Sequence, residues 1–481
     1  MLDYPDTYTK ITTELVRIEL NNNKFRLVGD IMVLDKIYED MSIRHPQAWY
    51  IKPHMPKGWD GKINYVSKAG YVKAGFLKRV VDLLESYDEE YYILDRRDEL
   101  EVTKIPLKVA DFIARTYQIE SVESVVLNMV GDVLYPRGVI AAATNAGKTL
   151  IAAMIYKSYE NAKALILLKN STLYTQFLDD MPKFFGDNWG YMRGKELRWG
   201  DIMVCMTPTL RNRISEYREQ LAGYNILLFD ECHEAPSKTN KFIIEHLHNT
   251  FVRVGLSGTP FDHKDKTKNM DVESFFGPEL YRIRNTELIE LGFSSPIVVK
   301  IIRGNTLVRY YGDYQREYKE GISLSDERNG IVIDRVKFYM DRGAIPLMVV
   351  CKFHEHVERL YEMITERFPE VDIRYIHHKV KDRNKILKDF KDGKFPILIS
   401  SLIIKIGQNI PLMKAMINAS SGSSQINTLQ LIGRILRTHK SKKKVYYEDF
   451  YDEGEYLRIH SKRRIRQYKN QGFKIIELYK P

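Results

Sequence analysis

Short apolar runs alternate with longer stretches of helical periodicity through most of this sequence, and this alternation constrains the fold more than any other feature. Runs that are apolar on both faces predict strands covered by helices on both sides, which is the environment of a parallel sheet. The pattern predicts an α/β domain over about residues 106–295. Its predicted strands are Val139–Ala141, Ala164–Leu168, Ile202–Met206, Ile226–Phe229 and Val252–Leu256.

A second set of strands and helices follows the break at Gly292–Pro296 and predicts a tandem α/β domain over residues 296–445. Helices are expected at about 355–367 and 381–391, and strands at Pro346–Cys351, Asp372–Ile376, Pro396–Ser400 and Ala415–Asn418. Residues 1–105 are rich in Tyr, Lys and Asp and predict a small α+β module. Residues 446–481 predict a short basic C-terminal extension.

A loop of small residues follows the first predicted strand and ends in Gly-Lys-Thr. Such a loop points its backbone N–H groups at phosphate oxygens, while Lys148 reaches the β- and γ-phosphates of ATP and Thr149 binds Mg²⁺. The full pattern has a glycine where Ala142 stands, so the match is incomplete. The candidate nucleotide-binding residues are Thr144, Asn145, Ala146, Gly147, Lys148 and Thr149.

An acidic pair, Asp230-Glu231, follows the fourth predicted strand, at a position where open parallel sheets bind ligands. We expect Asp230 to hold the metal of a Mg-nucleotide and Glu231 to orient and deprotonate the attacking water. The alternative is a solvated acidic loop with His233 as its neighbour. After the fifth strand, the hydroxyl-rich turn Ser257–Pro260 is a candidate relay for the state of the γ-phosphate site.

Upstream of the loop, Gln118 carries an amide that can donate to adenine and accept from it at once. It lies with Arg115 in one short segment, and the alternative is a helix-surface glutamine without a ligand.

Two arginines, Arg434 and Arg437, are three residues apart in Gln430–Arg437 and would share one helix face. Guanidinium groups aimed at a γ-phosphate stabilise transition-state charge, an effect on the order of 10³–10⁵ in rate. Structural salt bridges are the alternative. Because the second domain has no phosphate loop, it should act on a nucleotide held by the first.

The net charge of +11 favours a polyanionic partner, nucleic acid before membrane. Near the N-terminus, Trp59 lies in a glycine-flanked turn between Lys57 and Lys62, which suits base stacking and phosphate contact. The alternative is a hairpin with Trp59 in the core. Other candidate phosphate contacts lie near expected helix starts, where they can also be plain N-caps: Thr172, Gln176, Thr207 and Thr209.

Basic runs at Lys440–Lys444 and Lys462–Arg466 can contact phosphate or face solvent. The three cysteines, at 205, 232 and 351, form no C-x-x-C pair, so neither a disulfide framework nor a zinc site is expected. The sequence begins with no secretion signal and has no apolar run of membrane-spanning length, which favours a cytoplasmic protein.

Taken together and in this order, these motifs resemble those of the superfamily 2 helicases over about residues 110–445. In chain order, the similar segments are Arg115–Gln118 (the Q motif), Ala142–Thr149 (motif I), Leu173–Gln176 (Ia), Asp230–His233 (the DECH form of II), Ser257–Pro260 (III), Ser401–Pro411 (V) and Gln430–Arg437 (VI).

The resemblance implies two RecA-like domains with ATP·Mg²⁺ in the cleft between them, closed as the arginine pair meets the γ-phosphate. It also implies catalytic participation of Gln430, nucleotide contacts by Gly407 and Asn409, and a DNA contact by Ser401. Three positions depart from the usual motifs: Asn145 replaces a glycine, Ser401 a threonine and Asn409 an aspartate. The amide of Asn409 can still bond a ribose hydroxyl but brings no charge.

Within the superfamily, the turn Gly58–Ile63 in a small N-terminal domain is similar to that of phage DNA helicases of the UvsW type, which remodel branched DNA. The resemblance implies a DNA helicase or translocase that moves 3′→5′ and unwinds or branch-migrates forks and junctions. It would serve phage DNA replication, recombination or repair in the host cytoplasm, as a monomer on DNA and beside replication or recombination proteins.

The nearer alternative is an RNA helicase or the ATPase subunit of a restriction complex. An ATP-locked DNA clamp without hydrolysis is a different class of protein, against which Glu231 and the arginine pair argue. Leu307–Tyr314 is a candidate strand-separating insertion.

Overall fold

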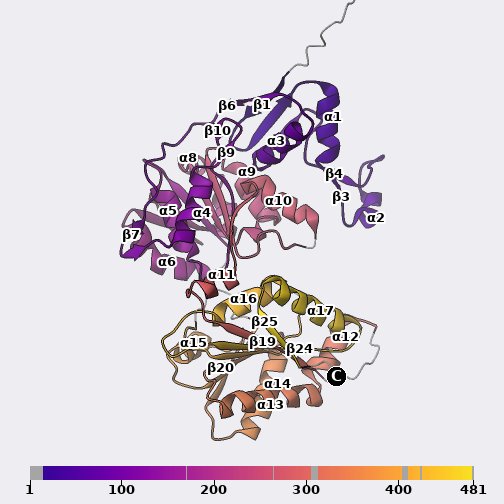
Figure 1. The fold of residues 1–481 in the computed structure, drawn as a ribbon, viewed down its shortest axis with the longest axis vertical. Coiled ribbons are helices and arrows are strands. Elements are labelled where there is room, and N and C mark those ends of the chain that lie inside the picture. The colour runs from indigo at the N-terminus through magenta and orange to yellow at the C-terminus, as the bar shows by residue number, and fades with distance from the viewer. Residues whose placement is uncertain are drawn as a thin grey trace, which may run out of the picture. The chain divides into compact units, whose positions relative to one another are not determined.

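The computed structural model of the chain describes residues 15–169, 171–263, 265–304, 312–402, 410–422 and 425–478. They form two compact units, one mainly of residues before Ile283 and one mainly of residues from Ile283 onward. Each unit contains one large, mostly parallel sheet with helices packed on it, and the first also carries the small N-terminal module (Figure 1). The predicted α/β class with two tandem parallel-sheet domains is confirmed.

The N-terminal module is a four-stranded sheet of order β5-β2-β1-β6, with two helices packed on it. Phe25 and Phe76 are fully buried in the core that these elements share. A separate hairpin extends from the module and carries a one-turn helix (Figure 1). The elements of the module are β1 Val16–Leu20, β2 Lys24–Val28, α1 Ile31–Asp40, β5 Tyr71–Lys73, α3 Leu77–Ser86 and β6 Tyr91–Asp95, with β3 Ser42–Arg44, α2 Ala48–Ile51, η1 Lys52–His54 and β4 Lys62–Asn64 in the hairpin.

The first large sheet has the strand order β14-β13-β15-β12-β16-β17-β11-β18. All five strands predicted from apolar runs are present, and neighbours among them are parallel. They are β11 Arg137–Ala142, β12 Ala164–Leu168, β15 Ile202–Met206, β16 Ile226–Asp230 and β17 Val252–Ser257. Three further strands extend the edges: β13 Trp189–Arg193, β14 Glu196–Arg198 and β18 Glu279–Ile283.

The longer helices of this domain are α4 Thr116–Val126, α5 Lys148–Lys157, α6 Ser171–Phe185, α7 Thr207–Arg213, α9 Lys238–His246 and α10 Lys266–Phe276.

The second large sheet is parallel throughout, with the strand order β21-β22-β20-β23-β24-β19-β25. The four strands predicted for this domain are confirmed as β20 Leu347–Cys351, β21 Ile373–Ile376, β22 Ile397–Ser401 and β23 Ala415–Asn418, and the two predicted helices as α14 His354–Arg367 and α15 Arg383–Lys391. The other elements are α11 Asn285–Glu290, β19 Ile297–Arg303, α12 Tyr314–Tyr318, η4 Lys319–Ser323, α13 Asp326–Asp341, α16 Gln425–Ile435, β24 Val445–Tyr451, α17 Glu455–Asn470 and β25 Lys474–Glu477.

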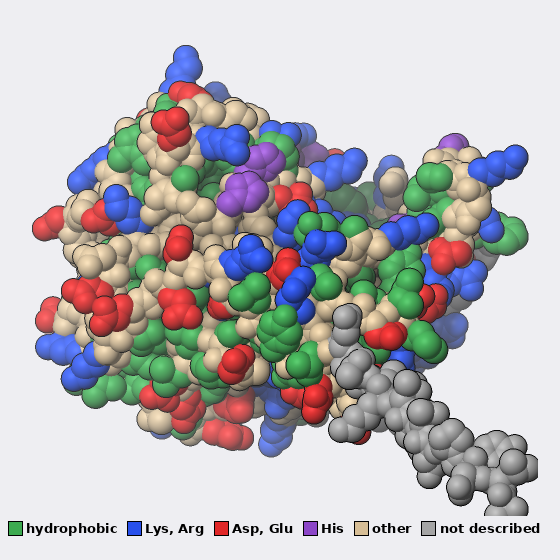
Figure 2. Space-filling view, turned by 90° about the horizontal axis from the view of Figure 1, so that it is seen from above, with side chains coloured by type: hydrophobic (Ala, Val, Ile, Leu, Met, Phe, Trp, Pro, Cys, Tyr) green, Lys and Arg blue, Asp and Glu red, His purple; other side chains and the backbone are tan. Residues whose placement is uncertain are grey.

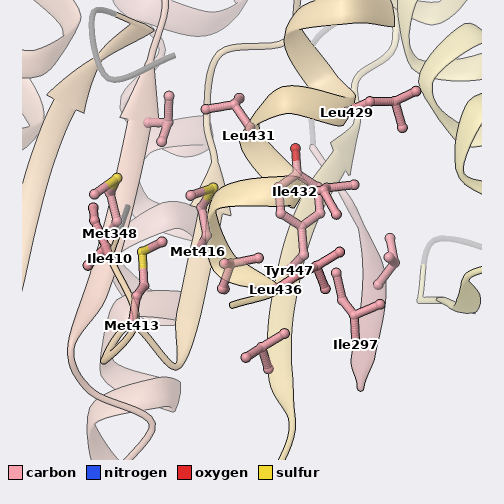
Figure 3. Close-up of a cluster of buried hydrophobic side chains, with 14 of the residues drawn as sticks. Ile297, Met348, Ile410, Met413, Met416, Leu429, Leu431, Ile432, Leu436 and Tyr447 are labelled. Carbon is pink, nitrogen blue, oxygen red and sulfur yellow. The ribbon is translucent and has the colours of Figure 1, made fainter. Parts of the chain in front are cut away.

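Helix α16, which precedes Arg437, is fixed on the second sheet by a core of buried apolar side chains (Figure 3). Leu431 and Ile432 of the helix belong to the same cluster as Met416 of β23 and Tyr447 of β24. Full burial of one such side chain is worth about 1.5–3 kcal/mol relative to exposure. The helix is therefore a rigid support for the polar residues at its end.

Residues 446–481, expected as an extension, supply most of β24 and all of α17 and β25 to the second sheet. Arg464, in one of the basic runs, is 1% exposed, and its Nε donates to Asp449 Oδ2 at 2.7 Å. The Tyr468 hydroxyl donates to the same oxygen at 2.5 Å. Arg464 therefore stabilises the core of the domain, and its side chain neither contacts phosphate nor faces solvent.

The N-terminal module is bonded to the first large-sheet domain through two buried arginines of that domain. Arg137 Nη2 donates to Asn22 Oδ1 at 3.0 Å, and Arg253 Nη2 donates to Asn23 Oδ1. Burial lowers the pKa of Arg137 to about 10 and also lowers the pKa of Arg253. The β1–β2 turn thus supplies oxygen partners to guanidinium groups that water does not reach.

Ion pairs form a second set of contacts between the module and this domain. Arg79 Nε and Nη2 donate to the two carboxylate oxygens of Glu273 at 2.8 and 2.6 Å. Lys73 Nζ donates to Glu245 Oε1 at 2.8 Å. Charge-assisted and bidentate bonds of this kind fix geometry as well as adding energy, so the module is held to the domain at several points.

Among the described helices, none is both long and apolar enough to cross a membrane. The three cysteines are buried and form no disulfide. Burial raises the pKa of the Cys205 and Cys351 thiols. No cluster of three or more His, Cys, Asp or Glu side chains suited to a metal ion occurs in the described ranges.

Candidate active site

Three neighbouring strands of the first sheet end at one edge, and each is followed by a predicted functional segment. Strand β17 lies between β16 and β11 and is parallel to both, with Asp230 opposite Leu256. The small-residue loop follows β11, the acidic pair ends β16, and the turn 257–260 follows β17. Because carboxyl ends of parallel strands share one edge, the fold brings these three segments together.

The small-residue loop passes twice through left-handed backbone, with φ of 79° at Asn145 and 81° at Gly147. Asparagine is one of the few residues other than glycine that adopt this conformation readily, so Asn145 maintains the turn that a glycine would make. Ala142, at the position of the missing first glycine, is the last residue of β11 and is fully buried. Its methyl group fits the strand, and the incomplete pattern does not prevent the loop from forming.

Helix α5 begins at Lys148, so Thr149 lies in its first turn. The backbone N–H groups and positive dipole end of such a helix favour a phosphate group.

Glu231 belongs to a hydrogen-bonded network with Ser257 and His233. It follows β16 in a left-handed conformation, with φ of 57°. The Ser257 hydroxyl donates to Glu231 Oε2 at 3.4 Å and lies 2.9 Å from His233 Nδ1, which is itself 3.3 Å from that carboxylate oxygen. The backbone N–H of Thr259 donates to Ser257 Oγ at 3.1 Å. The turn after β17 is therefore linked directly to the carboxylate expected to activate water.

His263 supports this network from the next loop, since its Nε2 donates to the backbone oxygen of His233 at 2.7 Å. Burial lowers the pKa of His263, which favours the neutral ring. His263 could not be predicted from the sequence, because a lone histidine in a polar loop carries no recognisable pattern.

Gln118 is buried in the first turn of α4, at 2% exposure. Its Oε1 accepts the backbone N–H of Arg115 at 2.9 Å in a capping arrangement. Arg115 Nη1 donates to the Tyr117 hydroxyl at 2.9 Å. The alternative of a helix-surface glutamine does not hold, and the oxygen expected to read adenine also caps the helix.

In the second unit, Arg434 lies in the last turn of α16 and Arg437 follows two residues after the helix ends. Lys391, the last residue of α15, is near both: burial first, and then the charges of Arg434 and Arg437, lower its pKa. Three cationic groups gathered in this way favour an anionic ligand such as phosphate. Sequence reasoning missed Lys391, since it stands in an ordinary helical tract.

Two protein-family models match parts of the two large-sheet domains. Residues 111–262 match the family described as "Type III restriction enzyme, res subunit", and residues 338–439 match the "Helicase conserved C-terminal domain". The chain belongs to the superfamily 2 helicases. Members of this superfamily hydrolyse ATP, and the matches support a DNA helicase or translocase.

Individual proteins match at low identity. "Putative helicase 22" of Sulfolobus islandicus filamentous virus is 24% identical over 377 residues, which are 71% of this chain and 65% of that protein. The ATP-dependent DNA helicase uvsW of Enterobacteria phage T4 is 25% identical over 378 residues, 71% of this chain and 73% of that protein. The aligned stretch thus spans slightly less than two thirds of the first relative's length.

Among solved structures, a fragment of a putative HsdR subunit of a type I restriction enzyme from Vibrio vulnificus YJ016 shares the fold. The two are 17% identical with a TM-score of 0.55, over 79% of this chain and 70% of that one.

The helicase motifs expected to grip a DNA strand start helices after β12 and β15. Thr172 and Gln176 lie in α6, and their side chains are outside the described part of the structure. Thr207 begins α7 and is 1% exposed. The Thr209 hydroxyl accepts the backbone N–H of Gly194 at 3.0 Å. The Thr207 side chain is therefore buried at the start of α7, and the Thr209 hydroxyl links α7 to the β13–β14 hairpin.

Motif V and the candidate wedge are only partly described. Ser401 is the last residue of β22 and is 8% exposed. Gly407 and Asn409 lie outside the described residues, as do positions 307–311 of the candidate insertion and the side chain of Gln430.

In the N-terminal turn, Trp59 is partly buried and helps to shape the hairpin. Its indole N–H donates to the backbone oxygen of Lys62 at 2.8 Å, and its ring meets the ring of His45 edge-on at 6.3 Å. The Lys62 ammonium group pairs with Glu39 at 3.0 Å, whereas Lys57 is exposed. The geometry favours a supporting role for Trp59 over a freely accessible stacking surface.

Proposed function

We propose that this helicase is an ATP-driven motor that unwinds or branch-migrates forked and junction DNA and moves 3′→5′ along one strand. The observation that carries the proposal is the network joining Glu231 to Ser257, because it couples the water-activating carboxylate to the turn after the neighbouring strand. The polarity and the branched substrate rest on the resemblance to phage helicases of the UvsW type.

The residues at the edge of the first sheet fit ATP with Mg²⁺. The hydroxyl of Thr149 and the carboxylate of Asp230 are oxygen donors of the kind that Mg²⁺ prefers, and the bound ion would neutralise charge on the phosphates. Lys148 would hold the β- and γ-phosphates, with Gln118 and Arg115 at the adenine. Glu231 would orient the attacking water and accept its proton, while Arg434 and Arg437 stabilise charge on the γ-phosphate.

Alternating closure and opening of the two domains would then move a strand held by its phosphates in the loops after β12, β15 and β22. Such contacts read no bases, so sequence preference is small and binding weakens in salt. We further propose that the protein acts as a monomer on DNA in the host cytoplasm, beside replication or recombination proteins of the phage.

The substitution Glu231→Gln tests the assigned chemistry. Removing a general base costs about 10²–10⁴ in rate, so DNA-stimulated phosphate release should fall about 100-fold or more while ATP binding persists. Glu234→Gln is the matched control, since Glu234 lies in the same turn and pairs with Lys169 at 2.6 Å. Unchanged phosphate release by Glu231→Gln would contradict the proposal.

Matched fork, four-way junction and blunt duplex substrates test what the motor acts on. Strand separation of forks and junctions with ATP supports the proposal, and ATPase stimulation by RNA alone would refute it.

The match to a restriction-enzyme subunit favours a second candidate, a duplex translocase. The ATPase activity of such a translocase would be stimulated by long linear duplex DNA, but the protein would not separate the strands. An ATP-locked clamp would bind DNA without turning over ATP.

A further inference from the structure

Two aromatic side chains on the hairpin of the N-terminal module are left almost wholly in solvent. Trp49 is 84% exposed and Tyr50 is 79% exposed, more than any other aromatic residue in the described part of the chain. Both lie on α2, in the connection between β3 and β4. Burial of large aromatic rings is favourable, so two consecutive residues that hold their rings in solvent indicate a binding surface.

The helix that carries these rings is held in place by the rest of the hairpin. The backbone N–H of His45 donates to Gly61 O at 2.8 Å, and the N–H of Ala48 donates to His45 O at 3.0 Å. Gly61 has φ of 89°, and a Cβ added to it would lie 3.3 Å from the Ala48 side chain. The indole N–H of Trp59 donates to Lys62 O and so closes the turn that leads into β4. Trp59 thus supports the tip, and Trp49 and Tyr50 are presented by it.

The charges around these rings complement a polyanion. Arg44, Lys52 and Lys57 are exposed, and no carboxylate of the described residues forms an ion pair with any of them. The one acid between residues 42 and 62 is Asp60, whose carboxylate accepts the backbone N–H of Lys62. Figure 2 shows Lys and Arg side chains beside hydrophobic ones on the lobe at the right of the view, the side on which the hairpin lies in Figure 1.

We propose that Trp49 and Tyr50 form a base-stacking element that covers the end of the duplex at a DNA branch, with Lys52 and Lys57 on the adjoining phosphates. The inference rests on the proposed function and adds the element that meets the bases. A ring laid on the last base pair replaces the stacking lost when the next pair opens, and every base offers a π-face, so the contact tolerates any sequence. Exposed lysines that follow the rings in the sequence contact the phosphates without reading the bases.

The position of the element suits this task. The module that carries it is bonded to the first RecA-like domain by Arg137 and Arg253, so the rings belong to the same unit as the ATP loop's flanking strand and helix. A strand drawn through the motor would pull the duplex against rings fixed to one of its domains.

The double substitution W49A/Y50A in the full chain tests the inference. Because base stacking on an aromatic ring contributes substantially to binding free energy, its loss should lower the fork-unwinding rate about tenfold. ATPase stimulation by long single-stranded DNA should stay within about twofold of wild type. W49F/Y50F keeps the rings and should unwind normally. Tyr92→Ala is the matched control, an aromatic 45% exposed on β6 of the same module.

A fork with 2-aminopurine in the base pair at the branch gives a second readout. Its fluorescence should change on binding to the wild type and W49F/Y50F without ATP, and this change should be absent with W49A/Y50A. Wild-type unwinding and signal in W49A/Y50A would overturn the inference, as would an equal loss of ATPase stimulation and unwinding. A wild-type protein that no DNA stimulates would instead overturn the proposed function, while the binding signal alone would still report the stacking contact.

Discussion

At the residue scale, a single hydroxyl couples the acidic motif to the turn after the neighbouring strand. Ser257 Oγ contacts Glu231, His233 and the backbone N–H of Thr259, and the side chain is fully buried. Ser257→Ala removes one hydrogen-bonding contact from each of these groups, so the Glu231 carboxylate should become less precisely positioned. We expect kcat for ATP to fall about tenfold, as for a general base that is present but misplaced, with KM within about threefold. Ser257→Thr retains the hydroxyl and should restore most of the rate; a wild-type kcat for Ser257→Ala would contradict this account.

A second residue gives the protein a defined acid sensitivity. His356 of α14 is 1% exposed, and its Nε2 donates to Asn329 Oδ1 at 2.9 Å. Burial, assisted by Arg328 and Arg359, lowers its pKa to about 3. In the unfolded chain the pKa is about 6.5, so between these values the unfolded state binds a proton that the folded state does not. Stability is therefore lost as the pH falls from 6.5 toward 3, by about 2 kcal/mol at pH 5.

His356→Gln keeps a side-chain donor near Asn329 and removes the titration. The free energy of opening of α14, measured by hydrogen exchange at pH 7.5 and pH 5.0, should change less between the two conditions in the variant than in the wild type. The difference should approach about 2 kcal/mol. Equal pH sensitivity of the two proteins would show that His356 is not the group responsible.

At the scale of elements, the β1–β2 turn is a structural joint between the N-terminal module and the first RecA-like domain. Asn23 Nδ2 donates to Glu245 O at 2.9 Å, and Asn23 Oδ1 accepts from the buried guanidinium of Arg253. Asn23→Ala should cost about 1–3 kcal/mol, because it leaves a buried charged donor unsatisfied. The exposed Asn21 is the matched control, and Asn21→Ala should change stability by less than about 0.5 kcal/mol. Urea unfolding, followed by proteolysis within the N-terminal module, measures the stability of both variants. Similar urea midpoints for the two variants would contradict a structural role for the β1–β2 turn.

Strands with uninterrupted apolar runs could be predicted, because burial on both faces leaves a readable pattern. β12 and β15 have the predicted bounds. β24 could not be found in this way, since its central residues Glu448 and Asp449 are charged and buried. Their partners, Arg335 and Arg464, each lie 2.7 Å away but belong to other elements of the chain. Only the tertiary structure reveals that such a strand satisfies its charges.

The same distinction holds for the candidate site. Residues that follow apolar strands, such as Asp230 and Lys148, could be placed at the sheet edge from sequence order alone. The contacts of Ser257 with His233, and the approach of Lys391 to the arginine pair, join segments whose spacing carries no pattern. The exposure of Trp49 is likewise a property of the folded hairpin, which buries the neighbouring Trp59 in part.

At the scale of the whole molecule, the net charge of +11 raises the question of whether DNA binding follows total charge or its placement. If the duplex arm of a fork is held by its phosphates, log affinity falls linearly with log salt by roughly 0.9 for each phosphate neutralised. Lys52→Gln/Lys57→Gln should therefore reduce the slope for fork DNA by about 1.8. Lys68→Gln/Lys104→Gln removes the same charge from exposed lysines elsewhere, taking +11 to +9 (11 − 2) in both variants. If the placement of the lysines determines binding, this control variant should have the wild-type salt slope. Equal slopes for the two variants would show that total charge governs binding.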